Sequence, residues 1–190
     1  MGRLVYIAIG SPDGFLADPD GDFGWAAPDA EVHAFVNDRL RGVGTFLYGR
    51  RTYALMTAWE HDPVLAAASP ETAGFAELWG RADKIVFSTT LDAVTTRRTA
   101  LRSAFDPEEV RRLKEGSTAD LAVSGPTLAR QAFAAGLVDE VQVFLVPVLV
   151  GAGLQVWPGV RARLALREEH RFTDGVVWLR HDVVGPGAVA

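Results

Sequence analysis

The sequence contains no cysteine, and this absence excludes several kinds of site at once. A chain without thiols forms no disulfide bond, uses no thiol nucleophile and offers no cysteine ligand for zinc. Histidine is scarce, because four residues are spread along the chain without the H-x-H or H-E-x-x-H spacing of a metal site. Lys84 and Lys114 are the only lysines, and the arginines are dispersed. With a net charge of −5, this composition does not favour a nucleic-acid or polybasic membrane partner, and we expect no metal site.

Long apolar runs are also missing. Residues 4–9 form an apolar run of only six residues, and the longest later stretch, residues 141–153, contains Gln142 and Pro147. Both are shorter than the roughly 20 residues that a membrane-spanning helix needs. The N-terminal run is too short for a targeting signal, so we expect a soluble cytoplasmic protein.

Several common catalytic signatures are missing as well. The chain has neither a G-x-S-x-G elbow nor a Walker phosphate loop. Gly151-Ala152-Gly153 resembles the start of a dinucleotide fingerprint, but the third glycine is absent and no helix pattern follows. We therefore reject a Rossmann fold.

The remaining composition is that of an ordinary globular protein. With 190 residues, 48% of them hydrophobic and 23% charged, the chain is long enough for one domain with a real core. It shows no internal repeat and no linker composition. We expect a single domain over residues 1–185 and a short tail over residues 186–190.

Strand-like and helix-like segments alternate through the first two-thirds of the chain. The apolar, β-prone segments are residues 4–9, 45–48, 84–88 and 121–124. Helix patterns cover residues 29–40, 69–79, 106–116 and 125–136, with Gly80 just beyond the second. The last third carries strand-like segments at residues 141–146, 164–172 and 176–184 without helices between them. This order predicts an α/β fold in which helices flank a mixed sheet and the C-terminal strands form an antiparallel meander.

Three loops follow predicted strands, and each contains residues suited to binding. Residues 11–15 place the Asp13 carboxylate beside a glycine turn. Arg50 and Arg51 stand where the second strand enters a short helix, and guanidinium groups are strong donors to anions. Gly125 opens a later helix, where a missing side chain lets a pyrophosphate approach backbone N–H groups. The alternatives are an ordinary Asp-Gly turn, a solvated basic pair and a ligand-free glycine turn.

Five motifs, taken in order, resemble those of one family. They are S-x-D-G-[FY] at residues 11–15, G-R-x-T-Y at 49–53, a loose K-x-V-x-S-x-T-L at 84–91, G-P-x-L-A…G-L-V-D-E at 125–140 and P-V-L-x-G-x-G at 147–153. The series resembles the dihydrofolate reductase-like fold, and within it the C-terminal reductase domain of the bacterial riboflavin-biosynthesis deaminase-reductase, in its stand-alone branch. The resemblance covers nearly the whole chain and implies a dihydrofolate reductase-like form of the mixed sheet.

The resemblance implies NADPH as the cofactor. It places the adenosine 2′-phosphate on the G-R-x-T segment and on the serine-containing strand end, and the pyrophosphate on the later glycine turn. The residues that it nominates for the cofactor are Gly49, Arg50, Arg51, Thr52, Ser88, Thr89, Ser124, Gly125, Pro126, Thr127 and Leu128.

The resemblance also nominates two carboxylates for the reaction. Asp13 matches the aspartate that lies near the reacting centre in the riboflavin-pathway reductases. Glu31, four residues before Phe35, repeats a spacing found in dihydrofolate reductases proper. Trp25 and Phe15 are candidates for the walls of the pocket, with a position in the core as the alternative.

The implied activity is hydride transfer from NADPH to a small polar heterocyclic or imine-like acceptor, either riboflavin-precursor-like or pterin-like. One carboxylate would orient the acceptor or relay a proton. The resemblance also implies a homodimer. The alternative is a non-catalytic nucleotide- or flavin-binding module on the same fold, which would keep Arg50 and Gly125 without turnover.

Overall fold

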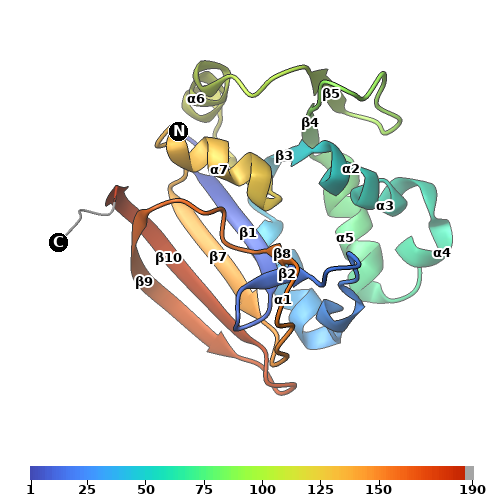
Figure 1. Ribbon diagram of the computed structural model, residues 1–190. Helices are drawn as coiled ribbons and strands as arrows, with labels where there is room; N and C mark the ends of the chain where they lie inside the picture. The colour runs from blue at the N-terminus through green and yellow to red at the C-terminus, as the bar shows by residue number, and fades with distance from the viewer. Residues whose placement is uncertain (187–190) are drawn as a thin grey trace.

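The computed structural model describes residues 1–186. Within them, eight strands form one sheet in the order β5-β4-β3-β6-β1-β7-β10-β9, and β2 pairs with β8 in a second, two-stranded sheet (Figure 1). The strands are β1 (Leu4–Gly10), β2 (Phe15–Ala17), β3 (Val43–Gly49), β4 (Asp83–Phe87), β5 (Thr99–Arg102), β6 (Asp120–Ser124), β7 (Glu140–Leu145), β8 (Leu154–Gln155), β9 (Ala162–Arg171) and β10 (Val177–Pro186). The helices are η1 (Gly24–Ala26), α1 (Ala30–Leu40), α2 (Arg50–Met56), α3 (Ala58–His61), α4 (Pro63–Ala66), α5 (Pro70–Arg81), α6 (Pro107–Gly116) and α7 (Pro126–Ala134).

The large sheet is mixed. Its strands from β5 to β7 pair in parallel, whereas β10 pairs in antiparallel fashion with both β7 and β9. The predicted α/β architecture with an antiparallel C-terminal meander is therefore confirmed. Strand β10 extends through Pro186, and the rest of the tail expected over residues 186–190 lies outside the described residues.

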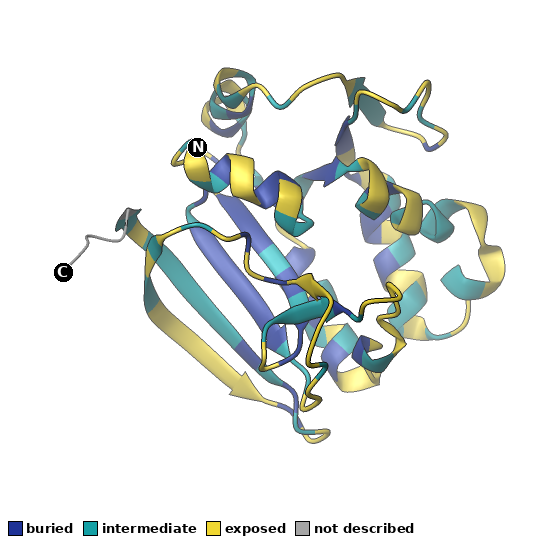
Figure 2. Ribbon diagram, viewed as in Figure 1, coloured by how far each residue is buried: buried dark blue, intermediate teal, exposed yellow. Residues whose placement is uncertain are grey.

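Each face of the sheet is covered by a different pair of helices. Alternation along β1 places Leu4 and Tyr6 in the cluster with α6 and α7, and Ile7 and Ile9 in the cluster with α1 and α5. Strands covered on both faces need apolar side chains on both, which explains the continuous apolar run at residues 4–9. Strand β9, at the sheet edge, is mostly exposed (Figure 2). No helix within residues 1–186 is both long enough and apolar enough to cross a bilayer.

Side-chain caps fix where α1 and α5 begin, but two predicted helix ends were wrong by two residues: α5 ends at Arg81 and α7 at Ala134. The Asp29 carboxylate accepts a hydrogen bond from the amide of Val32 at 2.8 Å, and Ser69 caps α5 in a capping box. Helix α5 does not stop before Gly80. It continues to Arg81, because the backbone becomes extended only at Ala82.

The shortest elements were not predicted. Strands β2, β5 and β8 and helices η1, α3 and α4 each contain no more than four residues. So short a segment shows no periodicity, and its conformation depends on a partner elsewhere in the chain. Strand β5, for example, is defined by parallel pairing with β4, in which Thr99 lies beside Lys84.

A buried carboxylate, Glu140, joins the start of β1 to β10. Glu140 is only 1% exposed. The carboxylate accepts hydrogen bonds from Arg3 at 2.6 Å, from Arg180 at 3.1 Å and from the Gln142 amide at 2.6 Å. Arg180 also reaches Glu168, an exposed carboxylate on β9, at 2.7 Å. The two carboxylates that pair with Arg180 therefore differ in burial and in their other partners, since Glu140 also binds Arg3 and Gln142.

Glu140→Ala is expected to lower the free energy of unfolding by about 3 kcal/mol, because it removes the buried counter-charge of Arg180. Glu168→Ala removes the exposed counter-charge of the same side chain and is expected to cost less than about 1 kcal/mol. Urea denaturation of both variants measures the difference. Equal losses would show that the burial of Glu140 adds nothing to the pair.

Candidate functional site

The loops that follow the parallel strands leave the sheet at one edge. Parallel strands have their carboxyl ends on the same side, and ligands of open α/β sheets collect there. The register aligns Tyr48 of β3 with Ser124 of β6, and Gly49 of β3 with Phe87 of β4. The structure thus brings together the three segments nominated for the cofactor, residues 49–52, 88–89 and 124–128.

Gly125 lies against Thr52 where two of these segments meet. Its φ is +88°, and a Cβ atom at this position would lie 2.7 Å from Thr52 Oγ1. A residue with a side chain would therefore be strained and would also collide with Thr52. Gly125 is the N-cap of α7 and supplies no side chain to cap it. Among the described residues, the first-turn amides of Thr127 and Leu128 have no hydrogen-bond partner, so this helix end offers free N–H groups.

The two arginines of the G-R-x-T segment are exposed at the start of α2. Within residues 1–186, neither Arg50 nor Arg51 forms an ion pair, whereas Arg3 and Arg180 are both held by carboxylates. An unpaired guanidinium keeps its N–H donors available for an anion. It can donate two parallel hydrogen bonds to one phosphate. The arginines directly precede Thr52 and the free amides of α7 follow Gly125, so the contact between Thr52 and Gly125 joins the two segments.

The loop after β4, which begins with Ser88 and Thr89, is held in place by Tyr53. The Tyr53 hydroxyl accepts hydrogen bonds from the amides of Thr95 at 2.8 Å and Thr96 at 3.2 Å. Burial alone would raise the pKa of the phenol, but hydrogen bonds from Thr96 and Thr95 outweigh burial and lower the pKa. The tyrosine of the G-R-x-T-Y motif therefore positions the loop. Sequence analysis missed this role because the partners lie more than 40 residues further along the chain.

Asp13 follows β1, and its side chain binds a loop that lies 137 residues further along the chain. Its carboxylate accepts hydrogen bonds from the amide of Gly151 at 2.7 Å and from the amide of Val150 at 3.1 Å. The Ser11 hydroxyl and these two amides lower the pKa of Asp13 below its ordinary value. Asp13 therefore stays ionised near neutral pH and joins the first loop of the edge to the P-V-L-x-G-x-G motif.

Glu31, the second nominated carboxylate, occupies a different place. Its carboxylate accepts hydrogen bonds from the hydroxyl of Thr173 at 2.5 Å and from the amide of the same residue at 3.2 Å. It lines a cavity of about 660 Å³ whose walls include Phe35, His170 and residues of α5. The bond to Thr173 ties α1 to the turn between β9 and β10. Glu31 is thus engaged away from the glycine turn at Gly125.

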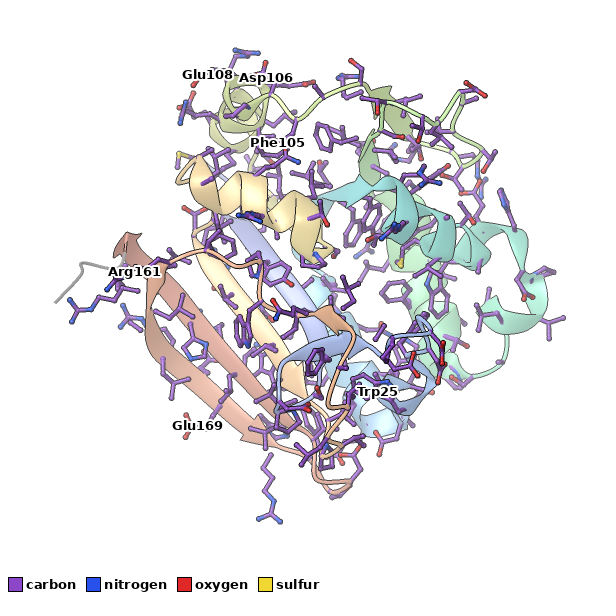
Figure 3. The ribbon with its side chains drawn as sticks, in the orientation of Figure 1. Trp25, Phe105, Asp106, Glu108, Arg161 and Glu169 are labelled. Atoms are coloured by element: carbon purple, nitrogen blue, oxygen red, sulfur yellow. The ribbon has the colours of Figure 1, made fainter. Side chains whose placement is uncertain are left out.

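A smaller cavity of about 170 Å³ lies where β1 and β7 end. Its lining includes Ile9 of β1, Val146 just beyond β7, and Trp25 of η1, which Figure 3 labels. Asp174, in the turn between β9 and β10, also lines it. Trp25 lines this cavity, whereas Phe15 is not among the lining residues; that Trp25 forms a wall of the acceptor pocket stays a prediction. In the sequence, Asp174 stands within Thr173-Asp174-Gly175, and no local pattern distinguishes it from an ordinary turn residue.

The sequence from residue 4 to residue 179 matches the model of a known protein family, the RibD C-terminal domain. The chain belongs to the RibD C-terminal domain family. The match spans every strand of the sheet up to the first residues of β10. A curated relative in Bacillus subtilis, the uncharacterised protein YyaP, is 28% identical over 181 aligned residues, and the match covers 92% of each chain.

Solved structures share the fold. A protein from Shewanella sp. PV-4 named for riboflavin biosynthesis superposes with a TM-score of 0.72 at 17% identity, covering 95% of this chain and 98% of its own. A pyrimidine reductase-like protein from Corynebacterium diphtheriae gives 0.62 at 15% identity, covering 96% and 92%. A deaminase/5-amino-6-(5-phosphoribosylamino)uracil reductase from Thermotoga maritima gives 0.61 at 18% identity, covering 96% of this chain and 56% of that one. This chain thus spans about half the length of the Thermotoga maritima deaminase/reductase.

Asp13→Ala is expected to release the loop around Val150, because the two amides lose their shared acceptor. Hydrogen exchange of the Val150 and Gly151 amides should accelerate by about tenfold or more. Asp13→Asn should have a smaller effect, since its amide oxygen still accepts one bond. Asp20→Asn, a change to an exposed carboxyl after β2, is the matched control and should leave both amides unchanged.

The hydrogen bonds between Asp13 and the amides of Val150 and Gly151 are expected to break in acid. A carboxyl whose pKa is lowered by folding stabilises the fold above its ordinary pKa and loses that contribution as the pH falls through the lowered value. The amide resonances of Val150 and Gly151 should therefore shift in acid with a midpoint below 3.8. A midpoint at or above 3.8 would mean that these amides do not hold the ionised Asp13.

Proposed function

We propose that the protein is an NADPH-dependent reductase that transfers hydride to a small polar heterocyclic or imine-like acceptor. The contact between Thr52 and Gly125 carries the proposal, because it joins two unpaired arginines to the free amides of α7 at the carboxyl edge of the sheet. Membership of the RibD C-terminal domain family supports a reductase of the riboflavin-pathway type. The name of the Thermotoga maritima structure, a uracil reductase, is consistent with that class.

The residues at the edge fit the phosphate groups of NADPH. Arg50 and Arg51 would hold the adenosine 2′-phosphate together with Thr52, Ser88 and Thr89, since guanidinium donors match phosphate oxygens. The turn from Ser124 to Leu128 would receive the pyrophosphate, because Gly125 lacks the Cβ atom that would block the approach and the amides that follow are free. The cofactor residues nominated from the sequence, including Gly49 and Pro126, all lie in these two segments or in the loop after β4.

When bound, NADPH supplies a hydride that, with a proton from solvent, reduces a C=N or C=O bond of the acceptor and leaves NADP⁺. The chain itself would bind the cofactor and the acceptor, orient them toward each other and exclude water. Asp13 is ionised, so in this scheme it orients the acceptor or accepts a proton, and it is a poor proton donor. Glu31 is the alternative carboxylate, and its bond to Thr173 would have to open first.

A homodimer is part of the proposal. In the described part of the chain, no helix covers the outer part of β10 and β9 on the face seen in Figure 1, and Leu166 on β9 is 53% exposed. Leu166 pairs with His181 of β10 in the sheet register, so the two share this face. A second copy of the chain placed here would cover an apolar surface. Sedimentation of the wild type as a dimer and of Leu166→Glu as a monomer is the expected result.

The double variant Arg50→Gln/Arg51→Gln tests the cofactor site. Loss of charge-assisted bonds to the 2′-phosphate should weaken NADPH binding by about ten- to a hundredfold and leave NADH binding nearly unchanged. Arg163→Gln, an exposed arginine on β9, is the matched control and should affect neither cofactor. Fluorescence titration of both cofactors measures the difference, and equal affinity of the wild type for NADPH and NADH would contradict the assignment. NADPH binding without oxidation by any pyrimidine, pterin or quinoid acceptor would favour a nucleotide-binding module.

A further inference from the structure

Charge is distributed unevenly along the carboxyl edge of the large sheet. In the strand order β4-β3-β6-β1-β7, the cofactor segments follow the first three strands, and the loops after β1 and β7 lie beyond them. A cofactor with its 2′-phosphate at β3 and its pyrophosphate at β6 would point its nicotinamide toward β1 and β7. We call residues 11–29, 146–157 and 172–176, which lie at this end, the acceptor half of the edge.

The acceptor half carries only negative charge. It contains no lysine, arginine or histidine, and its charged residues are the aspartates Asp13, Asp18, Asp20, Asp22, Asp29 and Asp174. Two arginines follow its segments or flank them, but both lie outside it. Arg161 precedes β9 and lies at the opposite end of that strand, far from Trp25 (Figure 3). Arg171 ends β9, and β10 separates β9 from β7.

Aspartates also occupy the backbone amides to which an anion would bind in this half. Free N–H groups at a helix start or in a tight turn are the usual backbone sites for anions. At the start of α1, the Asp29 carboxylate accepts from the amide of Val32 at 2.8 Å. In the turn after β2, Oδ1 of Asp18 accepts from the amides of Asp20 at 2.9 Å and Asp22 at 2.8 Å. The chain's own carboxylates therefore fill both sites.

The loop after β7 follows the same rule, and the cofactor half does not. Asp13 takes the successive amides of Val150 and Gly151, which would otherwise form a third anion site. Helix α7, by contrast, begins at Gly125 without a side-chain cap. The edge thus keeps backbone donors open where the cofactor phosphates are proposed to bind and closes them with carboxylates beyond that point.

The surface between these aspartates is apolar. Residues 146–157 include no charged residue, and within them Leu149 is 76% exposed and Trp157 is 42% exposed. Trp157 lies against the loop that carries Asp13, because a Cβ atom on Gly14 would be 3.5 Å from its Cδ1. Apolar surface screens charge less well than water does, so it strengthens the repulsion between these carboxylates and an anion.

We propose that the hydride acceptor carries no phosphate or carboxylate group. An anionic acceptor would place its charge among six aspartates, where no basic side chain of the acceptor half pairs with it and the amides are already taken. The inference rests on the proposed reductase function and narrows its substrate class to phosphate-free heterocycles. It separates this chain from the Thermotoga maritima enzyme, whose name specifies a phosphoribosylamino compound.

Titration of the wild type with inorganic phosphate at constant ionic strength, followed through the amide resonances, locates the anion sites directly. The amides of Thr127 and Leu128 should shift as phosphate is added, whereas those of Val32, Val150 and Gly151 should not. Shifts at Val150 or Val32 as large as those at Leu128 would overturn the inference. An absence of shifts at Thr127 and Leu128 would instead contradict the cofactor site of the proposed function, so the two failures are distinguishable.

Two pairs of acceptors that differ by one phosphate supply a second measurement: riboflavin with FMN, and pyridoxal with pyridoxal 5′-phosphate. The kcat/KM for NADPH oxidation should be about tenfold or more higher with the phosphate-free member. Leu149→Arg adds a cation to the acceptor half and should remove most of this preference. Val64→Arg changes a residue of α4 that is 80% exposed, and as the matched control it should keep the preference.

Equal or faster reaction of the wild type with the phosphorylated members would overturn the inference. An unchanged preference in Leu149→Arg would do the same, because the preference would then not arise from the charge of the acceptor half. The phosphate titration decides the inference for a protein that reduces neither pair.

Discussion

Parallel pairing of the strands from β5 to β7 is the constraint on which the rest of the molecule depends. A parallel strand pair needs a crossover on a face of the sheet, so α1, α5, α6 and α7 are obliged to cover the faces and to leave the edges free. The same pairing puts every carboxyl end of these strands at one edge. Residues separated by more than 70 positions, such as Thr52 and Gly125, come into contact there for that reason alone.

Most charges that the fold buries are used to hold it together. Lys84 is 1% exposed, donates to the carbonyl of Trp79 at 3.1 Å and lies over the indole ring, and burial lowers the pKa of its ammonium group. Lys114 binds Asp139 and Glu140 binds Arg3 and Arg180. Arg50 and Arg51, by contrast, are exposed and form no ion pair within residues 1–186, so their donors remain available.

Two long-range clamps give the carboxyl edge its shape. Tyr53 holds the loop after β4 through the amides of Thr95 and Thr96, and Asp13 holds the loop after β7 through the amides of Val150 and Gly151. In both clamps one side-chain oxygen satisfies two successive backbone donors, and in the Tyr53 clamp one of these donors, the amide of Thr96, is buried. Motif residues that are expected to meet a ligand can therefore serve first as supports for loops.

The sequence by itself determined the alternation of strands and helices, the C-terminal meander and the family, because these depend on local periodicity, caps and short motifs. It placed the start of α1 at Asp29 correctly, and it misplaced the end of α5, because Gly80 does not adopt the left-handed conformation of a C-cap glycine and the helix passes through it. Only the tertiary structure decided which carboxylates are free. Asp13 and Asp174 lie in turns and Glu31 in the first turn of α1, and what separates them is the partner that folding brings to each: a loop 137 residues away for Asp13, Thr173 for Glu31, and the Val176 amide beside a small cavity for Asp174.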